Sequence, residues 1–199
     1  MKTNKEMLEN LLSQIRSAKR VKGESIPDIL LYMDQVTSFM EDRLSSQRRS
    51  QKDKLLTKTM INNYAKNKLL PPPVKKKYSK DHVLLLLFIY YFKSFLSFAD
   101  IQVLLSPLME EHFKMQGSGL EEIYAAILYR HEEALPDMEE QIRSSFARAR
   151  EDFPGEEEGE LTWFSFLSQM ILEVYVKKCF IEKALDEIGE KRQERKKPG

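Results

Sequence analysis

One apolar run, HVLLLLFIYYF at residues 82–92, constrains the fold more than any other feature of the sequence. It holds no charged residue from Val83 to Phe92, and Lys93 closes it. A helix that crosses a bilayer needs about 20 apolar residues, so a run of this length is expected to be a helix buried in a globular protein. The rest of the chain must supply the helices that cover it, and no membrane partner is predicted.

The composition favours an all-α protein. Hydrophobic residues make up 42% of the 199 residues and only 7 are glycine, and the apolar positions recur at helical spacing without strand-like alternation. The one cysteine, Cys179, excludes an intramolecular disulfide and a Cys-rich zinc site. The N-terminal residues lack the apolar core of a signal peptide, so we expect a cytoplasmic protein.

Charge is distributed unevenly along the chain. Residues 1–106 hold 19 Lys and Arg against 10 Asp and Glu, whereas residues 107–199 hold 13 against 21. Between Arg48 and Lys80 there are 11 basic residues, and Asp53 is the one acidic residue. A basic segment of this kind attracts polyanions, although a solvated helix and loop surface would give the same pattern.

Capping residues and helix breakers divide the chain into three parts. We expect an N-terminal helix within residues 1–24, a helix-turn-helix domain over 25–106 and a helical region over 107–199. Ser25 with Pro27, Thr57, Ser79 and Ser97 each have the character of a helix start. The last region should hold helices at about 109–113, 120–134, 136–153 and 163–191, with an acidic loop at 154–160.

The helix expected at residues 57–68 divides into two faces on a helical wheel. Ile61, Tyr64 and Ala65 lie together, and a polar stripe lies opposite: Thr59, Asn62, Asn63 and Lys66. Amide, hydroxyl and ammonium groups can read base edges in the major groove. This interpretation predicts a recognition helix, and an ordinary amphipathic surface helix remains the alternative.

A basic segment follows this helix directly. Three prolines, at residues 71–73, stop the helix, and an extended stretch at 74–78 follows as a candidate wing, with one short β-hairpin. Its ammonium groups, together with Lys58, would hold the phosphate backbone. The side chains assigned to this role are Lys58, Lys75, Lys76, Lys77 and Tyr78. A stiff proline-rich connector with a solvated lysine cluster is the other interpretation.

From the helix at residue 57 to the end of the domain, the sequence resembles the DNA-binding domain of MerR-type regulators. That family has a capped recognition helix, a Leu-Leu-Pro turn, a wing that ends in Tyr-Ser, and a helix pair. The matching positions are Thr57, Ile61, Tyr64, Leu69, Leu70, Pro72, Tyr78, Ser79, Asp81, Leu96, Ile101 and Leu105. With LYMDQV at 31–36 and TKTMINNY at 57–64, the first half also resembles domain-of-unknown-function family 1836. The resemblance implies a MerR-like winged helix-turn-helix that binds double-stranded DNA.

The sequence departs from the MerR pattern at several positions. Asn62 stands in place of the usual Arg, Asn63 replaces the first aromatic residue, and Lys68 stands where that family has glycine. The wing is shorter, and the connector before Thr57 is longer than a standard turn. These differences affect the individual contacts with DNA more than the order of the elements.

Other chemistry is not indicated. His82, His112 and His131 are too far apart to predict a metal site, and Cys179 has no partner arrangement that would activate a nucleophile. No glycine-rich phosphate loop is present. The residues Trp163, Phe164, Phe166, Tyr175 and Phe180 form an aromatic-rich group on the last helix, expected in a core or a dimer contact. No heptad pattern sustained over several heptads is recognised, and no enzyme activity or cofactor is predicted.

The leading hypothesis is therefore a cytoplasmic, DNA-binding transcriptional regulator. Helix 57–68 would read the duplex and the wing at 74–78 would hold its backbone, while the acidic second half would serve dimerisation, effector binding or partner recruitment. A homodimer would match a palindromic site. The competing hypothesis is a non-enzymatic helical adaptor whose basic half binds an acidic protein.

Overall fold

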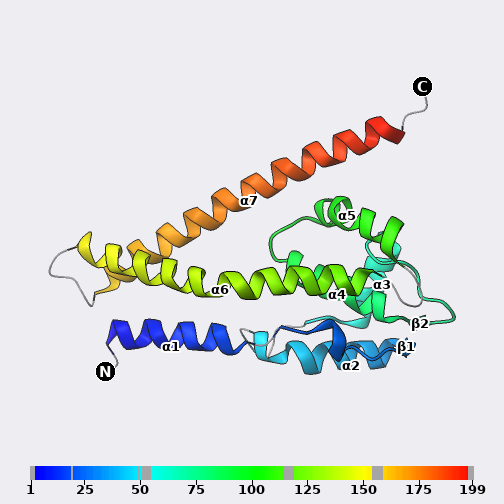
Figure 1. Cartoon of the computed structure of the whole chain (residues 1–199), viewed down its shortest axis with the longest axis horizontal. Helices are drawn as coiled ribbons and strands as arrows, with labels where there is room; N and C mark the ends of the chain where they lie inside the picture. Colours follow the sequence, from blue (N-terminus) through cyan, green and yellow to red (C-terminus); the bar gives the residue numbers. More distant parts are fainter. Residues whose placement is uncertain are drawn as a thin grey trace. The chain divides into compact units, whose positions relative to one another are not determined.

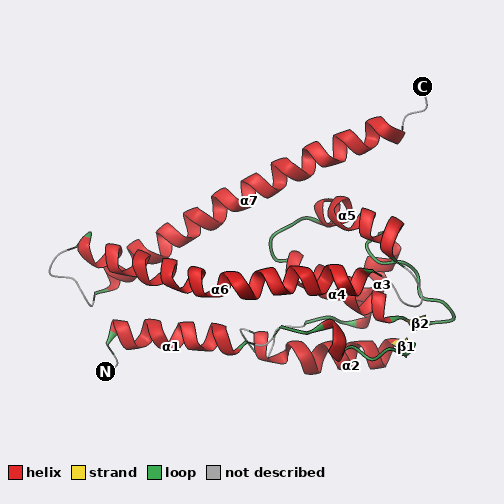
Figure 2. Cartoon of the chain, in the orientation of Figure 1, coloured by secondary structure: helices red, strands yellow, loops and turns green. Residues whose placement is uncertain are grey.

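The described part of the chain is mostly helical, with one small antiparallel sheet (Figures 1 and 2). The computed structural model describes residues 3–18, 20–48, 50, 55–113, 119–153 and 159–196. The helices are α1 Asn4–Ser17, α2 Met33–Leu44, α3 Lys58–Lys66, α4 Lys80–Phe92, α5 Phe98–Pro107, α6 Leu120–Glu151 and α7 Glu160–Lys196. The strands are β1 Leu31–Tyr32 and β2 Lys77–Tyr78, and short 3₁₀ or π turns lie at Gly23–Ser25, Ser45–Gln47 and Leu108–His112.

Contacts divide the chain into two compact units. Unit 1 comprises Met1–Lys19 and Tyr129–Ile181, and unit 2 comprises Arg20–Leu128 and Glu182–Gly199. Within unit 2, Tyr124 on α6 is buried and donates a hydrogen bond of 2.7 Å from its hydroxyl to the carbonyl of Val21.

Unit 2 is built around α4. Every residue of this helix from Asp81 to Ile89 is buried, which confirms that the apolar run is a core helix. Burying such a run on all sides removes a large apolar area from water, which stabilises the unit. The helices around it contribute Val36, Met40, Leu44, Ile61, Tyr64, Ile101, Leu105, Leu120 and Tyr124 to the same core.

Capping side chains set three of the helix starts in unit 2 where the sequence predicts them. The Thr57 hydroxyl accepts a hydrogen bond of 3.2 Å from the backbone N–H of Met60. The Ser97 hydroxyl accepts from Asp100 N–H at 3.2 Å, and the Asp100 carboxylate accepts from Ser97 N–H at 3.1 Å. Ser79 caps α4. Each of these bonds satisfies an N–H group that the helix itself leaves unpaired.

The start predicted for α2 is wrong. Ser25 ends a 3₁₀ turn, and the helix begins only at Met33. The residues just before it form β1, which pairs antiparallel with β2: Leu31 lies opposite Tyr78, and Tyr32 opposite Lys77. A long-range strand pairing, which helix periodicity cannot predict, therefore takes these residues out of the helix.

The second half holds fewer and longer helices than the sequence predicts. α6 runs without a break through Pro136, where two helices were expected. Proline has no N–H to donate, so its position inside a helix costs one backbone hydrogen bond. α7 extends three residues before Trp163 and five beyond Lys191. The predicted acidic loop lies largely outside the described residues.

Unit 1 packs α1 against parts of α6 and α7. Its core comprises Leu8, Leu12, Phe146, Ala149 and Phe166. Two salt bridges connect α1 with α6: Arg16 with Glu139, and Arg143 with Glu9 at 2.8 Å. The paired guanidinium of Arg16 lowers the pKa of the Glu139 carboxyl. None of the described helices is long and apolar enough to cross a membrane.

Candidate nucleic-acid interface

The two faces of α3 have opposite environments. Ile61 and Tyr64 are buried, and the Tyr64 ring meets Phe98 edge-on, with 5.8 Å between ring centroids. The polar stripe is exposed to solvent, as the helical wheel predicts: Thr59, Asn62, Asn63 and Lys66. One face packs against α2 and, through Tyr64, against Phe98 of α5, and the other leaves its amide and ammonium groups open to a ligand.

The C-terminal end of α3 has a strained residue. Lys68 has φ of 58°, in the left-handed region that a side chain disfavours. This backbone lets the N–H groups of Leu69 and Leu70 bond to the carbonyl of Tyr64, at 2.9 and 3.3 Å. The turn redirects the chain sharply after α3 and brings Leu69 and Leu70 into the core.

A tight hairpin follows the prolines, and lysines form its tip. Val74 and Lys77 exchange backbone hydrogen bonds of 3.2 and 3.0 Å, so the connection is a two-residue turn. Its central residues, Lys75 and Lys76, have φ of 51° and 62°. Two positive φ values are the signature of a type I′ turn, which normally takes Asn-Gly. Both lysine side chains are exposed, so the chain holds two ammonium groups at the tip despite the backbone strain.

The register of the hairpin separates Lys77 from Tyr78. Side chains alternate between the faces of a strand, and the Lys77 ammonium lies 5.1 Å from the centre of the Tyr32 ring on the outer side. Tyr78 turns inward and is 2% exposed. Its expected role as a phosphate contact is therefore corrected: the Tyr78 side chain belongs to the core, where its ring packs against His82.

Lys58 has an acidic neighbour. Its ammonium forms an ion pair with the carboxylate of Asp34 in the first turn of α2, and both side chains are largely exposed. Such a surface pair contributes little to stability. A phosphate would have to compete with Asp34 for this lysine, so Lys58 is a weaker anion contact than the lysines of the hairpin tip.

α3 and the hairpin lie within reach of one ligand. Seven residues, 67–73, connect them, and a chain of that length spans at most about 25 Å. The exposed or half-exposed basic residues of this region, here called the basic edge, are Lys66, Lys68, Lys75, Lys76 and Lys77. The α3 stripe, which shares Lys66 with the basic edge, adds exposed amide and hydroxyl groups in the same region.

Other potential sites are less developed. No group of three or more His, Cys, Asp or Glu among the described residues could hold a metal ion. His82 is buried, and its Nδ1 accepts a hydrogen bond of 3.0 Å from Ser79 N–H in a capping box. Cys179 is half-buried and free.

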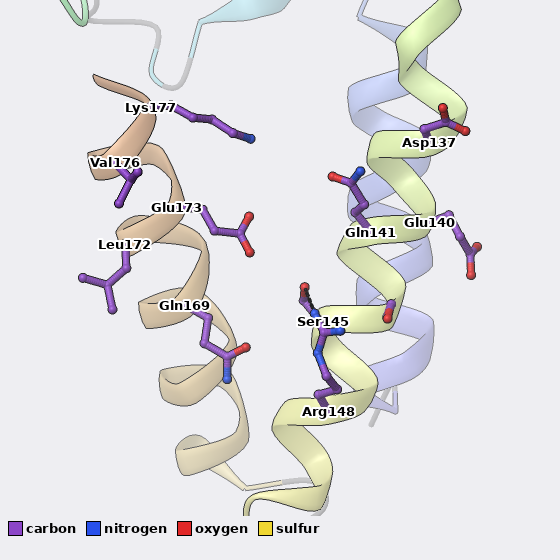
Figure 3. Close-up of a pocket in the computed structure, with 11 residues that line it drawn as sticks. Asp137, Glu140, Gln141, Ser145, Arg148, Gln169, Leu172, Glu173, Val176 and Lys177 are labelled. Atoms are coloured by element: carbon purple, nitrogen blue, oxygen red, sulfur yellow. Dashed lines mark hydrogen bonds between the residues drawn. The ribbon is translucent and has the colours of Figure 1, made fainter. Parts of the chain in front are cut away.

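Unit 1 contains a groove of about 1060 Å³ between α6 and α7 (Figure 3). Side chains of both charges line it, among them Glu140, Arg148, Glu173 and Lys177. The groove is open to polar ligands that can pair with either charge.

A family model matches residues 21–127, which is more than half of the chain, and is described as Domain of unknown function (DUF1836). The chain belongs to the DUF1836 family. The matched range coincides within one residue at each end with the first segment of unit 2, Arg20–Leu128, so the DUF1836 domain includes both α3 and the hairpin. No curated protein and no solved structure matches the chain.

Sequence reasoning identified the polar stripe and the lysine cluster but missed the backbone that presents them. The left-handed residues Lys75 and Lys76 carry no sequence signal, because glycine or asparagine is the usual marker of such positions. For Lys68 the one signal is its place at the glycine of the MerR pattern. Tyr32 was also missed as a support for Lys77. Its signal is weak, since it depends on a strand of only two residues.

Proposed function

We propose that the DUF1836 domain of this chain binds duplex DNA as a MerR-like winged helix-turn-helix and acts as a transcriptional regulator. In this arrangement α2 and α3 are the helix pair, α3 lies in the major groove, and the hairpin at 74–78 is the wing. One observation carries the proposal: two exposed lysines occupy the tip of a type I′ turn. A backbone strain retained at an exposed charged tip points to a functional role for those charges.

The proposed contacts fall into two groups. Asn62 and Asn63 would read base edges, because an amide can donate and accept toward adenine in the major groove. Thr59 and Lys66 would contribute beside them. Lys75 and Lys76 would contact phosphates, giving affinity without sequence preference.

The resemblance to MerR-type regulators gains support from the geometry of α3. Lys68, at the position of that family's glycine, adopts the backbone that a glycine would take. The Leu-Leu-Pro turn then leads into a two-residue hairpin, as a wing requires. Tyr78 and Ser79, the end of the wing in that pattern, anchor the hairpin to α4 instead of touching DNA.

A titration of labelled genomic fragments, followed by fluorescence anisotropy from 50 to 200 mM salt, tests the proposal. We expect binding that weakens steeply with salt. Substituting Lys75, Lys76 and Lys77 by Ala should weaken binding on all sequences and flatten the salt slope by about 2 to 3, near one for each lost phosphate contact. The matched control removes three exposed lysines from other helices: Lys5→Ala, Lys183→Ala and Lys191→Ala.

The control should bind as the parent chain does. A parent chain that shows no DNA binding at the lowest salt would refute the proposal and favour the adaptor that binds an acidic protein. An equal loss of DNA affinity in both triple variants would mean that only the net charge of the chain matters. An unchanged salt slope in the hairpin variant would mean that the hairpin does not act as a wing.

Base reading needs a separate variant. Asn62→Ala should relax selectivity at one or two base pairs by about 1–3 kcal/mol while leaving the salt slope unchanged. Selection of bound fragments from sheared genomic DNA, with parent and variant proteins side by side, measures this directly.

A further inference from the structure

Within unit 1, α7 carries an exposed apolar stripe that faces none of the described helices of that unit. The exposed fractions are 68% for Phe164, 66% for Ile171 and 61% for Tyr175. Further exposed apolar side chains extend it: Leu167, Val174 and Ile181. The aromatic group expected to form one face is in fact split, because Trp163 and Phe166 pack into the unit 1 core and Phe164 and Tyr175 do not.

Along the groove, polar side chains of the same helix face α6. Figure 3 shows Gln169, Glu173 and Lys177 pointing toward α6, whereas Leu172 and Val176, which also line the groove, extend away from α6. A helix of an isolated globular unit normally turns its apolar side inward and its polar side to water. Beyond the core contacts with α1 and α6, this part of α7 has the reverse orientation, so apolar side chains such as Phe164 and Ile171 are left in water.

The stripe has the spacing of a coiled-coil seam. Its residues, at alternating steps of three and four, are Phe164, Leu167, Ile171, Val174, Lys178 and Ile181. This spacing places them along one side of a helix, where knobs from one chain fit holes of the same geometry on another. The stripe covers only about two and a half heptads, which is why sequence analysis recognised no sustained heptad pattern.

We propose that this face of α7 is the interface with a second copy of the chain. The exposed apolar side chains on this face are Phe164, Leu167, Ile171, Val174, Tyr175 and Ile181, and they amount to roughly 500 Å², judged from ordinary side-chain areas. That lies at the upper end of the range for the largest patch on a typical monomer, about 300–600 Å². Two copies would together bury roughly 1,000 Å², which is about the minimum for a specific interface.

Charge also favours a second copy as the occupant. From Leu161 to Val176 the sequence has a single charged residue, Glu173, which points to the groove side. Lys178 is the one charged residue of the stripe, so two copies avoid repulsion when they meet antiparallel, an arrangement that keeps the two ammonium groups apart. A symmetric contact buries the same residues on both copies, so each seam residue contributes to the interface area twice. The proposal needs no DNA and stands independently of the proposed function.

Light scattering coupled to size exclusion, with the full chain at several concentrations and without DNA, tests the interface. The parent chain should have twice the monomer mass of 23.4 kDa. Ile171→Asp buries two carboxylates in the seam and should raise the dimer dissociation constant by roughly 100-fold or more. Ile171 is exposed in the single chain, so circular dichroism should show unchanged helicity.

The matched control is Ile29→Asp, at an apolar residue in unit 2 with a similar exposed fraction, 62% against 66%. It should leave the dimer intact. A parent chain that remains monomeric up to about 100 μM, well above the micromolar constants of weak specific interfaces, would overturn the proposal and leave the stripe to a different partner. A dimer that survives Ile171→Asp, or that Ile29→Asp dissolves equally, would overturn it as well.

Discussion

Replacing the strained hairpin tip by the residues its backbone prefers should stabilise the protein and weaken its binding to DNA. The double substitution is Lys75→Asn with Lys76→Gly, which installs the usual pair of a type I′ turn. The left-handed backbone costs a residue with an ordinary side chain about 1–2 kcal/mol, and asparagine tolerates it better, while glycine adopts it freely. The two substitutions together should raise the free energy of unfolding by about 1–2 kcal/mol, or roughly 3–6 °C in Tm for a chain of this size.

The effect on binding follows from the two lost charges. Each phosphate contact contributes about 0.9 to the slope of log K against log salt, so the slope should fall by about 2. At 0.15 M salt this corresponds to a roughly 30-fold weaker complex. Scanning calorimetry measures the first effect, and anisotropy titration from 50 to 200 mM salt measures the second.

A charge-preserving control separates strain from charge. Lys75→Arg with Lys76→Arg keeps both cations and both unfavourable φ values, so neither Tm nor the salt slope should change appreciably. Two results would refute the reasoning. An unchanged Tm in the Asn-Gly variant would mean that the tip carries no strain, and an unchanged salt slope would mean that its lysines touch no phosphate.

Three further predictions concern stability. Lys68→Gly should raise the free energy of unfolding by about 1 kcal/mol, because glycine adopts the left-handed backbone at the end of α3 without penalty; a lower urea midpoint would contradict this. Burial lowers the pKa of His82, so its contribution to stability should be complete above about pH 6.5 and decline as the pH falls below that value, where the unfolded chain binds the proton more readily. His82→Gln keeps an acceptor for the Ser79 N–H, as in a standard capping box, and should flatten that part of the pH profile in urea titrations; an unchanged profile would assign it to other groups. Tyr124→Phe leaves the buried carbonyl of Val21 without its 2.7 Å donor and should cost about 1–3 kcal/mol, whereas Tyr129→Phe, at an exposed position of the same helix, should leave the urea midpoint unchanged.

Local patterns in the sequence were enough to locate the core helix and the polar stripe. The apolar run before Lys93 could only be buried, and the spacing of Asn62 and Asn63 put both on the open side of α3 because helical periodicity is a property of the backbone itself. Capping residues such as Thr57 act within one turn, so they too could be read directly from the sequence.

Tertiary contacts decided the features that depend on distant residues. The pairing of β1 with β2 set where α2 begins and turned Tyr78 inward. A shift of one residue in this register would move every side chain of the strand to the opposite face. The same sheet fixed the hairpin that forces Lys75 and Lys76 into left-handed backbone.

Packing also determined which side of α7 became buried. Its stretch from Trp163 to Phe180 is apolar on several sides, so periodicity alone could not select one. Contacts with α1 and α6 selected Trp163 and Phe166 for the unit 1 core and left Phe164 and Ile171 exposed. Apolar residues provide the free energy for burial without specifying a partner, and the geometry of the assembled helices makes that choice.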